Sequence, residues 1–201
     1  MITKKKYQVI ALYGASGSGK DTILKWIVSH YPEINLIVSC TTRPPREGEV
    51  DGVDYHFISE EKFTEQVMNG EMLEATEFRG WFYGTQASAL SEETVNIGVF
   101  NPAGLMALEE NAEIELLKIF VDASDKTRML RCLNREKNPN VDEIVRRYQT
   151  DKRDLKEYFA ETGIMDRGYY LDNDNLDLDR LSVTTFENIM DDWATLFKLL
   201  R

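Results

Sequence analysis

A glycine-rich stretch near the N-terminus has the residue types and the spacing that bind phosphate. The spacing G-x-x-x-x-G-K is filled by Gly14, Ala15, Ser16, Gly17, Ser18, Gly19 and Lys20. The stretch follows an apolar segment expected to be a strand and precedes an expected helix. Glycines let backbone N–H groups converge on phosphate oxygens, the helix N-terminus adds a favourable dipole, and the lysine supplies a positive charge. The stretch therefore predicts a site for the phosphates of a nucleoside triphosphate.

The residue after the loop lysine departs from the usual pattern. A phosphate loop commonly has Ser or Thr there to ligate magnesium, whereas this chain has Asp21, followed by Thr22. An aspartate beside a triphosphate repels it unless a divalent cation lies between them, so one interpretation makes Asp21 a Mg²⁺ ligand, direct or through water. The other makes it a helix-initiating residue next to the positive end of the helix dipole. The sequence leaves both open.

A second candidate anion site lies in a proline-containing loop. Two prolines separate Arg43 from Arg46, and polyproline II geometry would put these arginines on one side of the chain, about 9 Å apart. Two guanidinium groups at that spacing can bind one phosphate, because each donates paired hydrogen bonds. Glu49 could hold one guanidinium, and Tyr55 and Tyr83 could add neutral donors. Alone, such a loop is more often a solvated turn. Beside a phosphate loop, it predicts the site of a phosphoryl acceptor.

The elements that must position these residues alternate between strand and helix. Apolar runs predict strands at residues 7–13, 36–40, 72–78, 81–83, 95–100 and 115–121. Periodic patterns predict helices at residues 22–29, 60–69, 103–110, 125–136, 142–161 and, at the C-terminus, 186–200. This alternation indicates a parallel sheet with helices on both faces. The expected class is therefore α/β, with three α/β/α layers.

Composition excludes several classes of protein. The 201 residues, 42% of them apolar, suit one domain. A net charge of −11 argues against nucleic acid or an anionic membrane as a partner. The two cysteines lack CxxC spacing, and no apolar run reaches the roughly 18 residues of a membrane span. The N-terminus has the pattern of a first strand rather than a signal peptide. We expect a soluble, cytoplasmic protein.

The region around the two arginines resembles the signature of the guanylate kinase family. The matching residues are Ser39-x-Thr41-Thr42-Arg43-x-Pro45-Arg46-x-Gly48-Glu49-x-x-Gly52-x-Asp54-Tyr55-x-Phe57. Further matches are Glu71-x-x-Glu74, Tyr83-Gly84-Thr85, Glu161-Thr162-Gly163 and Asn173-Asp174-x-Leu176, and the likeness runs from about residue 9 to 181. It implies a P-loop fold that phosphorylates GMP or dGMP with ATP and Mg²⁺. It also implies a core (about 1–37, 95–125 and 161–201), an inserted monophosphate-binding subdomain (about 38–94) and a helical lid (about 126–160).

The resemblance also implies roles for single residues. The acceptor-phosphate contacts would be Arg43, Arg46, Tyr55 and Tyr83, and the residues at the guanine would be Ser39, Glu74, Gly84 and Thr85. Guanine suits this set, because its N1–H and N2 amine are donors for Glu74 and its O6 accepts from Ser39. The transferring phosphoryl would be met by Lys20, Arg43 and the lid arginines Arg131, Arg135 and Arg147, with Arg146 competing for the last place. Asn173 would lie near the adenine of ATP.

One departure from the family pattern keeps alternatives open. The family usually has a run like Asp-x-Asp-x-Gln-Gly after its central strand, where this chain has Asn101-Pro102-Ala103-Gly104. Asn101 is then expected in the guanine pocket without a charge. Together with Asp21, this also resembles ribose 1,5-bisphosphate phosphokinase, a relative with the same fold. A third reading is a non-catalytic module that binds a phosphopeptide, which the intact phosphate loop disfavours. The expected assembly is a monomer or a homodimer.

Overall fold

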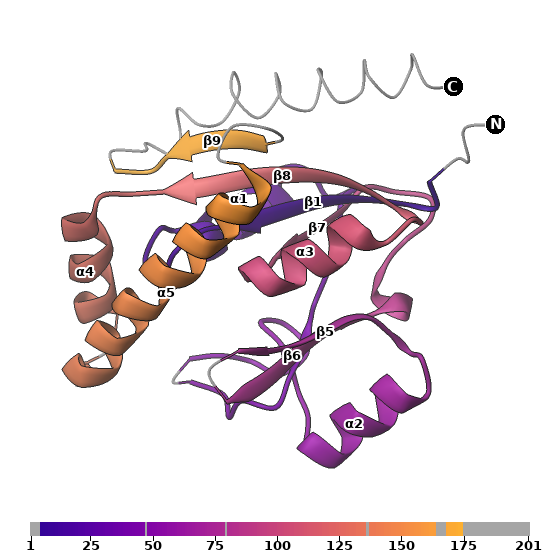
Figure 1. Ribbon diagram of the computed structural model, residues 1–201, viewed down its shortest axis with the longest axis horizontal. Coiled ribbons are helices and arrows are strands. Elements are labelled where there is room, and N and C mark those ends of the chain that lie inside the picture. Colours follow the sequence, from indigo (N-terminus) through magenta and orange to yellow (C-terminus); the bar gives the residue numbers. More distant parts are fainter. Residues whose placement is uncertain (1–4, 47, 79, 136, 164–167, 175–201) are drawn as a thin grey trace.

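The computed structural model describes residues 5–46, 48–78, 80–135, 137–163 and 168–174. The helix expected at 186–200, and the end of the resemblance from Leu176 to about residue 181, lie outside this part of the chain. The described part contains two β-sheets and five α-helices, and α2 (Glu60–Met68) lies apart from the larger sheet (Figure 1).

The larger sheet has five parallel strands in the order β2-β7-β1-β8-β9. The strands are β1 (Tyr7–Tyr13), β2 (Asn35–Leu36), β7 (Asn96–Val99), β8 (Ile114–Asp122) and β9 (Gly168–Asp172). The central strand β1 pairs with β7 on one side and β8 on the other (Figure 1). Because all five strands run the same way, the segments that follow β1, β7 and β8 meet at one edge, which is where open α/β sheets bind ligands.

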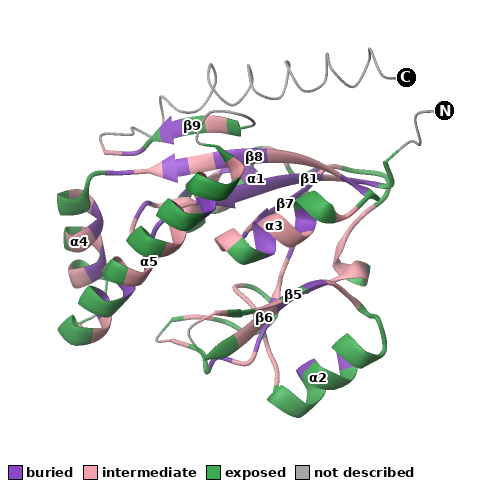
Figure 2. Ribbon diagram, in the orientation of Figure 1, coloured by how far each residue is buried: buried purple, intermediate pink, exposed green. Residues whose placement is uncertain are grey.

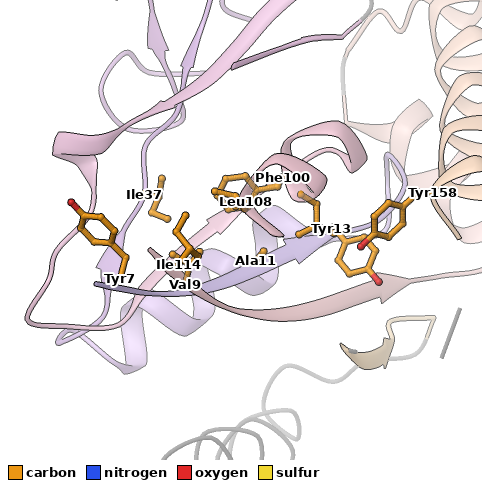
Figure 3. Packing of buried hydrophobic residues seen from close by; sticks show 10 residues of the cluster. Tyr7, Val9, Ala11, Tyr13, Ile37, Phe100, Leu108, Ile114 and Tyr158 are labelled. Carbon is orange, nitrogen blue, oxygen red and sulfur yellow. The ribbon is translucent and has the colours of Figure 1, made fainter. Parts of the chain in front are cut away.

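Two apolar cores cover the two faces of this sheet. Ile10 and Leu12 of β1 pack on one face against α1 (Lys20–His30), through Ile23 and Ile27. The residues that alternate with them on β1 face the other side, and there meet α3 (Pro102–Glu110) and α5 (Val141–Thr162) (Figure 3). This second core is made by Tyr7, Val9, Ala11, Tyr13, Ile37, Phe100, Leu105, Leu108, Ile114 and Tyr158. The three-layer α/β/α expectation is therefore confirmed, and the burial colours show β1 as its buried centre (Figure 2).

The smaller sheet has four strands in the order β4-β3-β6-β5, with β3 parallel to β4 and antiparallel to β6. Its elements are β3 (Cys40–Thr41), β4 (His56–Phe57), β5 (Met72–Phe78) and β6 (Trp81–Gln86), with α2 (Glu60–Met68) and the short helix η1 (Ala87–Ala89). The single strand predicted at 36–40 is wrong, because β2 ends in the larger sheet and β3 begins in the smaller one. The predicted strand at 81–83 is too short, because Gly84 and Thr85 continue the pairing with β5.

Two antiparallel helices stand beside the edge where the strands end (Figure 1). They are α4 (Asp125–Asn134) and α5, and the break between them falls where it was expected. The side chain of Asn140 begins α5 by accepting from the Glu143 N–H at 3.1 Å. Arg135 is the C-cap of α4, just past its end rather than inside the helix. In the part of the chain that the structure describes, no helix is long and apolar enough to cross a membrane.

Candidate active site

The phosphate loop lies between β1 and α1, and its neighbours fix its shape. Gly17 and Gly19 have φ values of 78° and 96°, which side chains rarely adopt. A Cβ at Gly17 would lie 2.5 Å from the carbonyl oxygen of Arg128 on α4, and one at Gly19 would lie 2.2 Å from Nδ2 of Asn173. The loop is therefore held between α4 and the segment after β9, and both glycines are required there.

Lys20 begins α1 at the mouth of this loop. Its Nζ donates to the carbonyl oxygen of Ala15 at 3.0 Å. Burial lowers the pKa of Lys20, while the carboxylates of Asp21 and Asp151 act in the opposite direction. The hydroxyl of Ser18 is buried and has no hydrogen-bond partner among the described residues. A phosphate placed on the loop would pair with this ammonium group.

A cavity of about 770 Å³ opens in front of the loop, and residues of the core, the smaller sheet and the α4–α5 pair all line it. Seven cationic side chains and four carboxylates face it, in a chain whose net charge is −11. The expected site residues in its wall are Gly14, Ser16, Gly17, Gly19, Lys20, Asp21, Thr22, Ser39, Arg43, Arg46, Tyr55, Glu74, Tyr83, Asn101, Arg131, Arg135 and Arg147. The remaining expected site residues, Ala15, Ser18, Glu49, Gly84, Thr85 and Asn173, are not part of the wall.

Glu49 holds the two arginines of the proline loop. Arg43 donates from both terminal nitrogens to the two carboxylate oxygens of Glu49, at 2.9 and 3.0 Å. The backbone N–H of Arg46 donates to the same carboxylate at 2.7 Å, and the guanidinium of Arg46 lies 3.7 Å from it. Burial acts to raise the pKa of Glu49, but these hydrogen bonds and charges outweigh it and the pKa lies below its usual value. The carboxylate is therefore ionised and fixes both cations.

The guanidinium of Arg46 faces other cations across the cavity. Burial lowers the pKa of Arg46, and the charges of Arg147, Arg43 and Arg135 lower it further. Two of these neighbours come from the α4–α5 region and one from the proline loop. Like charges gathered in this way repel one another, and a bound anion would relieve the repulsion that Glu49 leaves. Burial raises the pKa of the Tyr55 phenol, which lies beside Arg43 and stays a neutral donor.

A buried carboxyl group lies at the smaller sheet's end of the cavity. Glu74 is 7% exposed, and burial raises its pKa to about 7 even though Thr85 donates to it at 2.8 Å. The hydroxyls of Thr85 and Ser39 are 3.2 Å apart. Because Thr85 has one hydroxyl proton and gives it to Glu74, Ser39 must be the donor in that second bond. The three side chains thus form one polarised chain that ends on the carboxylate.

Asn101 begins α3, and its oxygen is already engaged. Its Oδ1 accepts from the Gly104 N–H at 2.7 Å, which makes it the N-cap of the helix, and its amide nitrogen lies 3.4 Å from the hydroxyl of Thr76. A Cβ added at Gly104 would lie 3.3 Å from Oε2 of Glu74. Asn101 therefore lines the pocket, as expected, but it also supports the helix that packs on Glu74.

Arg131 reaches from α4 to the back of the phosphate loop. Its guanidinium donates to the carbonyl oxygen of Asn173 at 2.7 Å and to that of Ser18 at 3.3 Å. Asn173 in turn donates from Nδ2 to the Ser18 carbonyl at 2.5 Å. The structure thus places Asn173, expected near adenine, beneath the loop instead of in the cavity wall. In this position Asn173 supports the phosphate loop through its hydrogen bond to Ser18.

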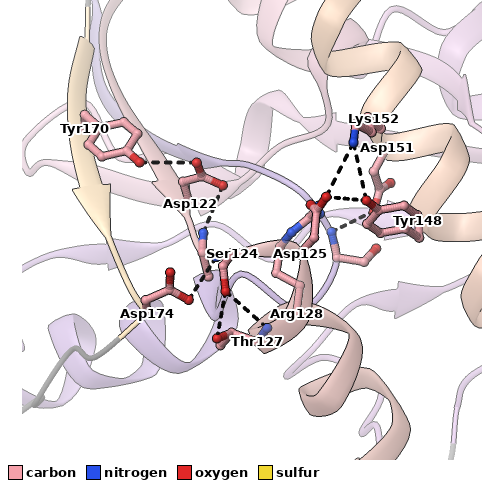
Figure 4. A network of polar contacts seen from close by, with 12 residues as sticks. Asp122, Ser124, Asp125, Thr127, Arg128, Tyr148, Asp151, Lys152, Tyr170 and Asp174 are labelled. Carbon is pink, nitrogen blue, oxygen red and sulfur yellow. Dashed lines mark hydrogen bonds and ion pairs between the residues drawn. The ribbon is translucent and has the colours of Figure 1, made fainter.

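A polar network ties α4 to α5 (Figure 4). The carboxylate of Asp125 accepts from Arg128 at 2.6 Å, from the hydroxyl of Tyr148, and from Lys152 at 3.4 Å. The hydrogen bond from Tyr148, followed by that from Arg128, lowers the pKa of Asp125 to about 2. The guanidinium of Arg128 also lies 5.3 Å from the ring centre of Tyr148. These contacts hold α4 and α5 together, and with them the arginines that the two helices place at the cavity.

Known proteins with similar sequences and structures include several guanylate kinases. The sequence profile described as guanylate kinase matches residues 6–185. The chain belongs to the guanylate kinase family. A guanylate kinase of Frankia casuarinae is 40% identical over 138 residues, 68% of this chain and 67% of that protein. One from Synechococcus sp. is 50% identical over 91 residues, 45% of this chain and 49% of that protein, so the chain spans about half the length of the curated relatives it matches there.

A solved structure agrees with this family. The crystal structure of guanylate kinase from Anaplasma phagocytophilum matches with a TM-score of 0.58 and 25% identity, over 89% of this chain and 84% of that one. The family resemblance and the fold class expected from the sequence are both confirmed.

Two charged residues of this guanylate kinase family member escaped the sequence analysis. Asp151 of α5 is buried, lines the cavity and accepts from the Ser16 N–H at 2.7 Å. Arg128 of α4 is buried, and its backbone borders Gly17 of the loop. A signal for Asp151 existed, because it lies four residues after Arg147 and so on the same face of the helix.

The residues near Asp21 fit a magnesium ion carried by a nucleotide. Within the described residues, no group of three or more His, Cys, Asp or Glu side chains could hold a metal by itself. Asp21 and Thr22 line the cavity and are exposed, so they can offer oxygen atoms. Mg²⁺ typically binds one or two carboxylates plus phosphate and water oxygens. Such an ion would therefore take most of its ligands from phosphates.

Proposed function

We propose that this chain transfers the γ-phosphoryl group of ATP to GMP or dGMP. The observation that carries the proposal is that the phosphate loop, the two arginines of the proline loop and Glu74 line one cavity. The phosphate loop with Lys20 faces the Arg43–Glu49–Arg46 cluster, and the buried Glu74 lies at the acceptor end. A triphosphate on the loop and a monophosphate on the arginines would point at each other, and guanine would meet Glu74.

Catalysis in this arrangement needs positioning and charge neutralisation. The attacking oxygen already belongs to an ionised phosphate, so no general base is required. Arg43 and Arg46 would hold the acceptor, and Lys20 the donor, so that the two phosphates lie in line. Arg131, Arg135 and Arg147 would then neutralise charge on the transferring group. Mg²⁺ held near Asp21 would neutralise further phosphate charge.

We propose three working parts. The core, about 1–37, 95–125 and 161–201, would carry the donor site; the insert, about 38–94, the acceptor site; and α4 and α5, about 126–160, a lid. Lid closure would exclude water, which otherwise accepts the γ-phosphoryl group. A cytoplasmic location, and a monomer or homodimer as the assembly, stay predictions.

The proposal is tested by measuring ADP release with a panel of acceptors: GMP, dGMP, AMP, CMP, UMP and ribose 1,5-bisphosphate. We expect turnover with GMP or dGMP and a large preference over AMP, because adenine would place an acceptor where Glu74 needs a donor. Turnover with the sugar bisphosphate alone would replace the proposed acceptor. The absence of turnover with every acceptor would leave a binding module instead of an enzyme.

Substitution of the loop lysine, compared with substitution of an exposed lysine, tests the proposed donor site. Lys20→Ala should abolish phosphoryl transfer while leaving thermal unfolding unchanged, since the ammonium group faces the cavity. Lys62→Ala removes the same charge from an exposed position on α2, outside the cavity, and should leave turnover at the wild-type rate. Equal activity in Lys20→Ala and Lys62→Ala would refute the donor site.

A further inference from the structure

A carboxylate of α5 lies on the phosphate loop, at a position where a phosphate oxygen is expected. Asp151 is 8% exposed and lines the cavity, and its Oδ2 accepts from the backbone N–H of Ser16 at 2.7 Å. Figure 4 shows Asp151 beside the network that ties α5 to α4. The N–H groups of such a loop are the groups that bind phosphate, so Asp151 uses part of the anion site.

The surrounding charges fit this interpretation. Asp151 is close enough to Lys20 to act on its ammonium group, which Arg147 and Arg128 oppose. The carboxylate therefore balances part of the positive charge around the loop while no nucleotide is bound. A carboxylate and a phosphate are both acceptor-only anions, and one N–H cannot donate fully to both.

We propose that Asp151 is an internal substitute for a phosphate group, and that the donor must displace its carboxylate from the phosphate loop in order to bind. The inference rests on the proposed function in taking the donor to be a nucleoside triphosphate. Two anions near one N–H repel each other, so Asp151 weakens donor binding. Asp151 belongs to α5, which also carries Arg147, so a shift of this helix that takes the carboxylate off the loop would move Arg147 with it. Donor binding and lid position are thereby linked through one side chain.

A purely structural role for Asp151 makes the opposite prediction. If the hydrogen bond serves only to keep the loop in shape, its loss should loosen the loop and weaken donor binding. If the carboxylate competes with phosphate, removal of its charge should strengthen donor binding. The sign of the change therefore separates the two roles.

The test is direct binding of ATP and of inorganic tripolyphosphate, measured by calorimetry at low salt with the full chain. Asp151→Asn keeps the shape and an acceptor oxygen but loses the charge, and should bind both ligands about tenfold more tightly, since a hydrogen bond to a charged group is lost by the competitor. Asp151→Ser should behave in the same way. Asp151→Glu, which keeps the charge, should stay close to wild type. Glu157→Gln makes the same charge change at an exposed position on α5 and should alter affinity less than about twofold.

The outcomes separate this inference from the proposed function. Unchanged or weaker binding in Asp151→Asn and Asp151→Ser, with thermal unfolding showing both folded, overturns the inference whether or not GMP is phosphorylated. Tighter binding in these two variants supports it, even if the acceptor panel later points to another substrate. Tripolyphosphate carries no base, so its result reports phosphate binding in the cavity without a contribution from adenine.

Discussion

Glu49 makes the two arginines of the proline loop into one site. A lone Arg-Pro-Pro-Arg turn would leave two long side chains in solvent, each losing rotamer entropy when it binds. Here Arg43 is 7% exposed and is held by both oxygens of Glu49, which also accepts from the Arg46 backbone. The pair is therefore positioned before any acceptor arrives, and its remaining donors can be directed at a phosphate.

The first prediction concerns this carboxylate. Glu49→Gln should lower the free energy of unfolding at pH 7 by about 2 kcal/mol, since bonds to a charged group are lost. The folded pKa of Glu49 lies below the unfolded one, so its contribution is present above about pH 4.3 and is lost as pH falls through the folded pKa. Urea denaturation at pH 7 and pH 3 measures the difference in free energy of unfolding between wild type and Glu49→Gln. This difference should be smaller at pH 3. Glu60→Gln, an exposed change on α2, is the control; equal losses in the two variants would contradict the prediction.

The second prediction follows from the buried carboxyl group of Glu74. Burial raises its pKa to about 7, so below that pH much of the ligand-free protein carries a neutral group that accepts poorly from guanine. The kcat/KM for GMP reports ionisation of the free enzyme, and should rise as pH increases through about 7. The phosphate of GMP also titrates, near pH 6, but it does so in every variant.

Glu74→Gln isolates the contribution of the protein. Its kcat/KM for GMP should be lower at pH 8 and should lack the rise near pH 7, because the amide does not titrate. The comparison uses initial rates from pH 5.5 to 8.5 for both proteins. Parallel profiles would show that Glu74 does not read the base in its ionised form.

At the scale of elements, the α4–α5 pair is joined by contacts at one end. Asp125 begins α4, and it receives Tyr148 and Lys152 from α5. The side chain of Asp125 is 54% exposed, so these contacts are worth little to global stability. Their effect is on the relative position of the two helices, and hence on the arginines that both carry.

The third prediction tests that linkage. Tyr148→Phe removes the hydroxyl and keeps the ring beside Arg128, so global stability should fall by less than about 1 kcal/mol. Amide hydrogen exchange should nonetheless speed up at the start of α4 and in the first half of α5. Tyr170→Phe removes a comparable bond, to Asp122 on the larger sheet, and serves as the control. Equal exchange of α4 and α5 in the two variants would mean that the network does not join the helices.

The elements also show which sequence patterns were sufficient. The apolar run at 7–13 predicted the strand β1, and the two cores bury both of its faces. The apolar run at 36–40 was misread because burial continues from β2 to β3 while the hydrogen-bond partner changes from β7 to β6. A continuous apolar pattern records burial and carries no information on which sheet a residue joins. Strand β9 was not predicted, and its Gly168, Tyr169, Tyr170 run gives a weak signal for a buried strand.

At the scale of the whole molecule, the sequence predicted the chemistry of the site better than its supporting contacts. Motif spacing singled out Lys20 and Arg43, and the family resemblance singled out Glu74; all three line one cavity in the structure. The contact between Asp151 and the loop spans 135 residues, and that between Asn173 and Ser18 spans 155. Such pairs depend on how helices and strands pack, which a local pattern does not encode.

The last prediction uses the single cavity that the core, the insert and the α4–α5 pair share. A ligand in which adenosine and guanosine are joined by five phosphates should reach from the phosphate loop to Glu74 and occupy both sites at once. Joining the two ligands makes the second contact intramolecular, so affinity should exceed that of ATP or GMP by roughly a hundredfold or more. The thermal unfolding temperature should rise accordingly, since the ligand binds the folded chain.

The matched probe with two adenosines should bind at least about tenfold more weakly, because it leaves Glu74 without a donor. Calorimetry measures both. A stoichiometry of two ligands per chain would show that one ligand does not bridge the loop and the arginine cluster. Equal affinity for the two compounds would show that Glu74 does not distinguish guanine from adenine.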